Sequence, residues 1–292
     1  MTPSFESVTI TTPKGYLLFG LWAGSPQAKR VLIVLHGLGA NLFALQDILA
    51  PLATTDTALL FFNNRGHDDV SSVRKIDKRK AKGYTSVRAG AAHEVFTQCE
   101  DDIQGAINLA THRGVQLIVL VGHSTGCQKS AYYLRKQKNQ HQVHGVTYLC
   151  PMSDLAGMEK IVGSATWVKA HAEANKLIRS HQVHALLPQD IWPELVDAQR
   201  FTSLYSPASP EEIFSYSQPR KIPTTLRNIK IPSLVILAGR DEYRDRPIKH
   251  IAQWFINNFK SNINHVAVLS QASHNLAGHE SEVRNLIQHH LR

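Results

Sequence analysis

The stretch VLVGHSTGCQKS, from Val119 to Ser130, joins an apolar run to a tight turn and then to a segment of helical character. Its centre, Gly122-His123-Ser124-Thr125-Gly126, fits the pattern G-x-S-x-G between a strand and a helix. In that setting a strained turn lifts the serine hydroxyl clear of the sheet, and glycines allow the backbone to crowd. The helix then points its N-terminal N–H groups at the turn. We therefore predict that Ser124 is a nucleophile, held in an elbow formed with Gly122, His123 and Gly126.

A serine hydroxyl needs a base that takes its proton, and the base needs a group that orients it. Asp241 follows the apolar segment SLVILA, and His274 follows the apolar segment HVAVL. The chain order serine, acid, histidine is the order expected for a strand–turn–helix elbow. We predict that His274 accepts the Ser124 proton and that Asp241 holds the imidazole in the correct tautomer.

Other residues compete for these two roles, since the chain has 16 histidines. None of the other candidate bases lies directly after an apolar strand as His274 does; they are His265, His279, His289 and His290. Asp154 follows the expected strand ending at Leu149 and is an alternative acid, or else a helix cap. Glu242 and Asp245 are close neighbours of Asp241 and remain alternatives as well.

The stretch His36-Gly37-Leu38-Gly39-Ala40 follows the expected strand VLIVL. Its glycines permit a bend that points an N–H group into the site. We predict an oxyanion hole made by the N–H groups of Leu38 and Thr125, the latter being the residue after the nucleophile. Loss of one such donor typically costs about 3 kcal/mol of transition-state stabilisation. His36 itself is expected to be a structural histidine.

The rest of the chain alternates short apolar strands with helical segments. This rhythm predicts a mostly parallel sheet with helices on both faces, and the first 23 residues predict an antiparallel hairpin at one edge. The expected strands are 5–12, 15–23, 31–35, 58–62, 117–121, 146–149, 234–237 and 266–269. The expected helices are 42–50, 94–112, 127–136, 158–180, 188–200 and 280–291.

One region, residues 154–230, breaks the rhythm because it has no convincing strand. We interpret it as a mainly helical cap inserted after the sixth expected strand, over the carboxyl edge of the sheet where ligands bind in such folds. The core then comprises residues 1–153 and 231–292. Most of the cap aromatics are expected to form the cap's own core.

Composition and charge also limit the partners and the cellular location that we expect. The net charge of +9 is partly concentrated in the run from Arg74 to Lys82. This run lacks interleaved aromatic residues, so we interpret it as a solvated mobile loop and expect no nucleic-acid partner. No apolar run is long enough for a membrane helix, and no secretory signal is evident. With three widely spaced cysteines, a cytoplasmic protein with reduced thiols is expected.

No phosphate loop, dinucleotide fingerprint or zinc-ligand spacing is present, so we expect neither cofactor nor metal. The composition leaves the oligomeric state open.

The motifs HGLGAN, FNNRGHD, GHSTG, GRDEY and ASHNL together resemble the α/β-hydrolase superfamily over nearly the whole chain. The motif GHSTGCQ, the stretch RFTSLYSP…EEIFSYS and the motif GRDEY resemble a largely uncharacterised family that includes fungal hydrolases of siderophore esters. That resemblance implies a serine hydrolase in which Ser124, Asp241 and His274 have their usual roles. This chain has Arg244 and Asp245 where the family pattern reads Val-Pro after D-E-Y, which alters the rim of the pocket.

The expected function is therefore that of a carboxylic ester hydrolase acting on a small-molecule ester through an acyl-enzyme. The same machinery serves acyltransferases, thioesterases, lactonases and C–C hydrolases, which remain alternatives. A non-catalytic ligand-binding scaffold is a further alternative, although such scaffolds usually carry a broken triad.

Overall fold

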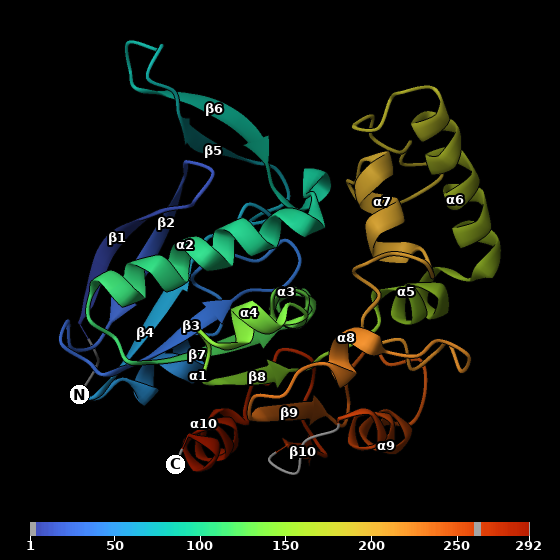
Figure 1. The fold of residues 1–292 in the computed structure, drawn as a ribbon. Coiled ribbons are helices and arrows are strands. Elements are labelled where there is room, and N and C mark those ends of the chain that lie inside the picture. The colour runs from blue at the N-terminus through green and yellow to red at the C-terminus, as the bar shows by residue number, and fades with distance from the viewer. Residues whose placement is uncertain (1–3, 260–263, 292) are drawn as a thin grey trace.

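The computed structural model describes residues 4–259 and 264–291, and within them ten strands form one mixed sheet (Figure 1). The strand order is β10-β9-β8-β7-β3-β4-β2-β5-β6, and β1 pairs with β2 outside this path. Strands β3, β4 and β7 to β10 run parallel, whereas β1, β2, β5 and β6 pair antiparallel. The strands are β1 (Phe5–Thr11), β2 (Tyr16–Ala23), β3 (Arg30–Leu35), β4 (Thr57–Phe62), β5 (Ser71–Ile76), β6 (Tyr84–Ala89), β7 (Leu117–His123), β8 (Gly145–Leu149), β9 (Ser233–Ala238) and β10 (Asn264–Leu269).

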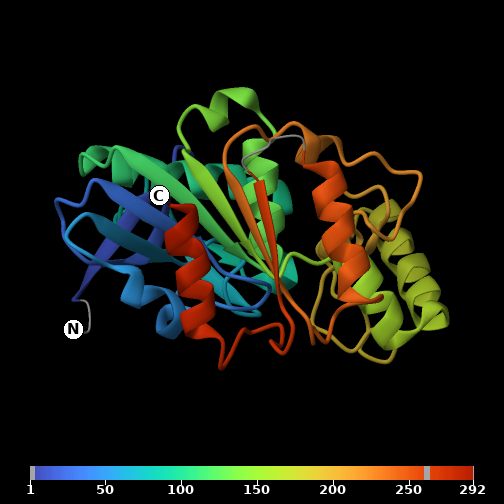
Figure 2. The ribbon, with the colours of Figure 1, turned by 90° about the horizontal axis from the view of Figure 1, so that it is seen from below.

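Side chains alternate between two cores, one on each face of the sheet. Along β3, Val31 and Ile33 pack in one core while Leu32 and Val34 pack in the other, as the two-residue period of a strand requires. Helices α1 (Gln46–Leu49) and α10 (Glu280–His290) cover the second face. The first face is covered by α2 (Cys99–His112), α3 (Thr125–Leu134), α8 (Thr224–Arg227) and α9 (Ile248–Asn258). Figure 2 shows α9 and α10 on opposite sides of β10. The predicted α/β-hydrolase architecture with a mostly parallel sheet is confirmed, and the antiparallel part includes β5 and β6 in addition to the predicted hairpin β1–β2.

The predicted cap segment contains helices α5 (Asp154–Val162), α6 (Ser164–Arg179) and α7 (Ala198–Tyr205), which stand together to one side of the sheet (Figure 1). They share a core of their own, in which Trp192, Phe201 and Tyr205 are buried. Phe214 and Tyr216, by contrast, pack in the core beneath α2, α3 and α9. The division into residues 154–230 and the remainder stays a prediction.

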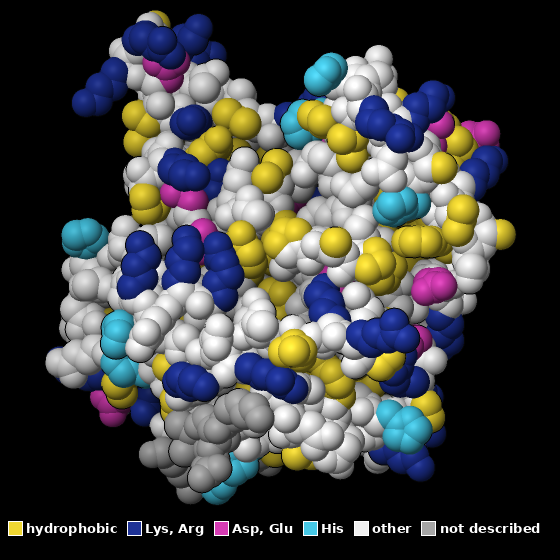
Figure 3. Space-filling model, turned by 45° about the vertical axis from the view of Figure 1, so that its right-hand side comes forward, with side chains coloured by type: hydrophobic (Ala, Val, Ile, Leu, Met, Phe, Trp, Pro, Cys, Tyr) yellow, Lys and Arg dark blue, Asp and Glu magenta, His cyan; other side chains and the backbone are white. Residues whose placement is uncertain are grey.

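The interpretation of the basic run as a loop was correct only in part, because Arg74 and Lys75 lie in strand β5 whereas Lys78, Arg79, Lys80 and Lys82 lie in the turn between β5 and β6. Residues 71–89 form the antiparallel hairpin β5–β6 at the edge of the sheet, and Lys and Arg side chains gather at its projecting tip (Figure 3). Only Val73 and Ala89 in its two strands are buried, so the hairpin lacks the apolar alternation that marks a strand. Charged residues are common on edge strands because they discourage pairing with other chains. The cap segment consequently follows the eighth strand in chain order, not the sixth.

Helix boundaries differ from the prediction in several places, and α2 begins at Cys99 rather than at residue 94. The segment 42–50 is helical only over α1. Most of the segment 188–200 is irregular, since α7 begins only at Ala198. The Asp197 carboxylate caps this helix by accepting the N–H of Arg200. The segment 158–180 is two helices, α5 and α6, which meet at Gly163. The short helices α4 (Gln137–Gln140) and α8 and the longer helix α9 were not predicted. No helix in the described residues has the length and apolar character needed to cross a membrane.

Candidate active site

The elbow at Ser124 has the strained geometry that the sequence predicts. Ser124 lies between β7 and α3 with φ 52° and ψ −124°, a conformation that non-glycine residues rarely adopt. A Cβ atom on Gly122 would lie 2.4 Å from the Gly126 carbonyl oxygen, and one on Gly126 would lie 2.2 Å from the Leu35 carbonyl oxygen. Both positions therefore require glycine, because no side chain fits between the strand, the turn and the helix.

His274 and Asp241 meet at the same edge of the sheet. Nδ1 of His274 lies 2.7 Å from Oδ2 of Asp241, and both side chains are buried. The other carboxylate oxygen of Asp241 accepts the N–H of Tyr243 at 3.0 Å. Since a carboxylate only accepts hydrogen bonds, His274 carries a proton on Nδ1 and presents Nε2 as its free nitrogen.

The competing acids have other partners. Asp154 Oδ2 accepts the side-chain amide of Gln128 at 2.7 Å. Burial, together with Glu211 and Glu212, raises the pKa of Asp154 well above its ordinary value. Asp154 is the first residue of α5, but the helix cap is made by Ser153, whose hydroxyl accepts the N–H of Ala156. Asp245 pairs with Arg246. Of the candidates considered, Asp241 is the acid that contacts the His274 ring.

A cavity of about 600 Å³ opens beside these groups, and Ser124 and His274 both line it. Its opposite wall comes from the cap segment and includes Met158, Leu204 and Tyr205. None of the four competing histidines is among the described residues that line it. The cavity thus places Ser124 and His274 before a space that is partly apolar and large enough for a small organic molecule.

The two expected oxyanion donors flank Ser124. Leu38 lines the cavity, and a Cβ atom on Gly37 would lie 3.0 Å from Ser124 Cβ, so this loop packs directly against Ser124. Thr125 is the first residue of α3. Within residues 4–259 and 264–291, neither the Leu38 N–H nor the Thr125 N–H has a protein acceptor. Two such donors beside a serine are what an oxyanion requires.

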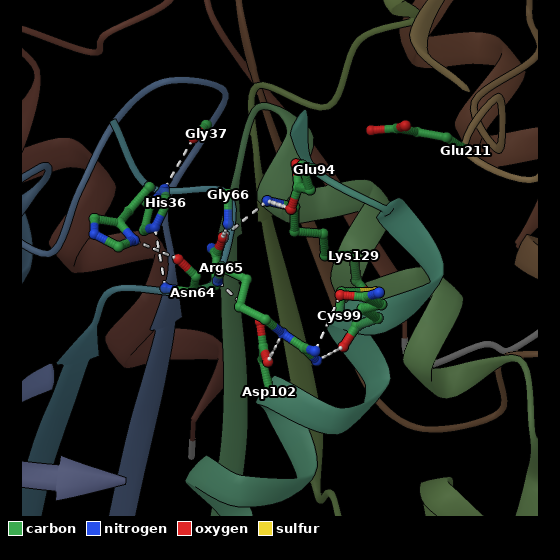
Figure 4. A network of polar contacts seen from close by, with 12 residues as sticks. His36, Gly37, Asn64, Arg65, Gly66, Glu94, Cys99, Asp102, Lys129 and Glu211 are labelled. Carbon is green, nitrogen blue, oxygen red and sulfur yellow. Dashed lines mark hydrogen bonds and ion pairs between the residues drawn. The ribbon is translucent and has the colours of Figure 1, made fainter. Parts of the chain in front are cut away.

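Two further residues of the motifs have structural roles. Nδ1 of His36 contacts the Gly37 carbonyl at 2.9 Å, Nε2 accepts the N–H of Asn64, and burial lowers the pKa of His36 to about 3 (Figure 4). Cys127 is fully buried and its thiol contacts two backbone carbonyls, which fits packing rather than nucleophilic attack.

One group of side chains has donors suited to a metal ion. The ligand atoms of Cys150, Asp241 and His274 all lie within 4.8 Å of one another. Two of these atoms already share the 2.7 Å hydrogen bond between His274 and Asp241. The absence of a metal remains a prediction.

A second buried polar cluster lies one turn further along α3, and no motif in the sequence indicates it. Lys129 Nζ lies 2.6 Å from Glu94 Oε1 (Figure 4). Arg200 of α7 lies 2.9 Å from Glu94 Oε2 and 2.5 Å from Glu211. Lys129 also donates to Asn64 at 3.1 Å. The four charged residues come from distant parts of the chain, so no local spacing marks them. We name Lys129, Glu94, Arg200 and Glu211 the ionic cluster.

The comparisons with known proteins agree with this fold. The structure is similar to the Pyrococcus furiosus esterase Pf2001 (TM-score 0.63, 18% identity, covering 99% of this chain and 90% of the esterase). It is also similar to the siderophore hydrolase EstB from Aspergillus fumigatus (TM-score 0.65, 17% identity, 99% and 98%). A third similar structure is the α/β hydrolase GrgF from Penicillium sp. sh18 (TM-score 0.68, 15% identity, 99% and 96%).

At these identities the similarities establish the fold, which is that of the α/β hydrolases. No curated protein matches the sequence. Residues 83–291, from β6 to the end of α10, match a family described as "Protein of unknown function (DUF1749)". Since the match covers well over half of the chain, the protein belongs to this family.

Proposed function

We propose that this protein is a serine hydrolase that cleaves a carboxylic ester through an acyl-enzyme intermediate. The observation that carries the proposal is the Asp241–His274 hydrogen bond at a cavity that also contains Ser124 in its strained elbow. The similar structures from Pyrococcus furiosus and Aspergillus fumigatus are described as an esterase and a siderophore hydrolase, which supports the same reaction class.

The chemistry follows from the groups present. Nε2 of His274 takes the Ser124 proton while Oγ attacks the ester carbonyl, and Asp241 stabilises the imidazolium that forms. The oxyanion of the tetrahedral intermediate receives hydrogen bonds from the N–H groups of Leu38 and Thr125. His274 then gives the proton to the leaving alcohol. In the second half of the reaction His274 takes a proton from water as the water oxygen attacks the acyl-enzyme carbonyl, and it returns this proton to Oγ of Ser124 as the acid product leaves.

A fluorophosphonate probe tests the proposal, because it labels only a serine that a neighbouring base activates. We expect labelling of the wild type at Ser124, no labelling of Ser124→Ala, and normal labelling of Ser273→Ala, a control serine beside His274. Equal labelling of the Ser124→Ala variant would place the reactive residue elsewhere, and an unlabelled wild type would remove the proposal.

The acyl-group preference is tested with nitrophenyl esters of increasing chain length, alongside thioesters and lactones. We expect the esters to give the highest kcat/KM, and Ser124→Ala to abolish turnover of every substrate. Faster turnover of thioesters or lactones would change the reaction class while leaving the catalytic groups in place.

A further inference from the structure

Both backbone peptide groups of His274 are held by side chains, in addition to the contact of its ring with Asp241. The His274 N–H donates to Glu242 Oε2 at 3.0 Å. The His274 carbonyl lies 2.9 Å from Nε2 of His123. The backbone that carries the imidazole is therefore held by hydrogen bonds on both its N-terminal and its C-terminal side.

The two side chains that fix His274 come from the immediate neighbours of the other catalytic groups. His123 precedes Ser124 at the end of β7, and Glu242 follows Asp241 after β9. The loop from 270 to 279 that carries His274 is thus tied to the elbow on one side and to the acid loop on the other. A shift of His274 relative to either partner would break one of these two contacts.

The contact with His123 also fixes the protonation of that residue. Burial lowers the pKa of His123 to about 4, helped by the nearby His274, so the ring is neutral near pH 7. A carbonyl oxygen accepts hydrogen bonds only, so the single proton of His123 lies on Nε2. The rings of His123 and His274 lie 5.0 Å apart between centroids, and Tyr243 contacts the His274 ring edge-on at 4.8 Å.

We propose that His123 and Glu242 are positioning residues that hold the His274 backbone so that the imidazole stays between Asp241 and Ser124. The proposal rests on the proposed function, in which His274 is the general base. Neither residue supplies or accepts the proton that moves in the reaction. Their effect is on geometry, where a displacement of about 1 Å can cost roughly 100-fold in rate.

Paired variants separate the hydrogen bond from the bulk of the side chain. His123→Leu removes the donor, whereas His123→Gln keeps an N–H group at a similar reach. We expect His123→Leu to lower kcat by about 10- to 100-fold with KM within about twofold, and His123→Gln to recover most of the loss. Glu242→Leu and Glu242→Gln form the matching pair. His279→Leu, in the same loop and without contact to His274, serves as the control and should keep wild-type kcat.

A second readout does not depend on turnover. The proton on Nδ1 of His274, shared with Asp241, should give a downfield proton NMR signal that is absent in Asp241→Asn. We expect the signal to shift or broaden in His123→Leu and to return in His123→Gln. If no ester is cleaved but the signal behaves in this way, the positioning role stands and the proposed function fails.

Three outcomes would overturn the positioning role. One is a His123→Leu variant with wild-type kcat and an unchanged signal. Another is a change confined to KM, which would make His123 only a wall of the cavity. The third is a loss that His123→Gln does not recover. If His123→Leu does not fold, the Glu242 pair decides by the same two readouts.

Discussion

One polar cluster lies at the N-terminal end of helix α3, another lies at its second turn, and the two clusters are built in different ways. At the first, Ser124 faces a cavity beside His274, whose ring contacts Asp241. At the second, Lys129 lies in the ionic cluster, where its side chain has no exposed surface and contacts Glu94. The first cluster leaves Oγ of Ser124 and Nε2 of His274 available to a substrate. The second pairs its charged groups with one another and closes them off from solvent.

This difference in solvent access and pairing points to different roles for the two clusters. A buried charge is costly unless an opposite charge and further hydrogen bonds compensate for it. In the ionic cluster burial alone would raise the pKa of Glu94, but Lys129 and Arg200 outweigh it and the pKa is lowered. Because Arg200 belongs to α7 and Lys129 to α3, these pairs join the cap segment to the helix that begins directly after Ser124. The ionic cluster holds structure in place, and the first cluster is where we propose that the chemistry occurs.

The largest effect on kcat is expected from variants that distinguish the two acids near the cavity, Asp241 and Asp154. Asp241→Asn should lower kcat by about 10⁴-fold, since an amide no longer fixes the His274 tautomer. Asp154→Asn should change kcat by less than about tenfold, because Asp154 contacts Gln128 and not His274. Steady-state kinetics on a nitrophenyl ester measures both. A greater loss in Asp154→Asn would assign the acid to Asp154.

The next largest effect is expected in the free energy of unfolding when the ionic cluster is changed. Lys129→Met leaves Glu94 with Arg200 alone in a buried site, and we expect a loss of about 3–5 kcal/mol in the free energy of unfolding. Lys136→Met is the matched control, since Lys136 pairs with Glu100 at the surface and such pairs contribute less than about 1 kcal/mol. Urea denaturation measures both values. Similar losses in the two variants would show that the Lys129 pair contributes no more than a surface pair.

The sequence was informative where the proposed catalytic residues follow the ends of apolar strands. Ser124, Asp241 and His274 each follow such a strand, so the parallel order alone brought them to one edge. The hairpin β5–β6 was missed because an edge strand with one buried residue has no apolar alternation. Helix α9 was missed although Ile248, Ile251, Ala252 and Phe255 have helical spacing, a pattern that could have predicted it.

The contacts that hold His274 and the ionic cluster were not predictable in the same way. The contacts of Glu242 and His123 are made to the backbone of His274, and a backbone group carries no sequence signal. In the ionic cluster, Lys129 and Glu94 are joined only after α3 packs beside the segment that precedes α2. Such pairs form only when distant segments pack together, so the sequence around one residue does not indicate its partner.

The smallest expected effect is on the pH dependence of the free energy of unfolding. His36 and His123 have pKa values lowered from 6.5 to about 3 and about 4, so each stays neutral in the folded protein where the unfolded chain takes up a proton. Their contribution to stability is complete above pH 6.5 and is lost as the pH falls below it, by about 1.4 kcal/mol per pH unit for each. Glu94, with a lowered pKa, loses its contribution only below its ordinary value of 4.5.

Buried acids with raised pKa values act in the opposite direction, among them Asp102 at about 6 and Glu212 at about 7, so the total pH dependence mixes both signs. A difference measurement isolates one histidine. Between pH 6.5 and 5 the wild type should lose about 2 kcal/mol relative to His36→Gln, which has no group to titrate at that position. Urea denaturation of the two proteins at several pH values gives this difference. Parallel curves would mean that His36 takes up a proton in the folded state, and that the loop beside Ser124 tolerates a charge which its burial argues against.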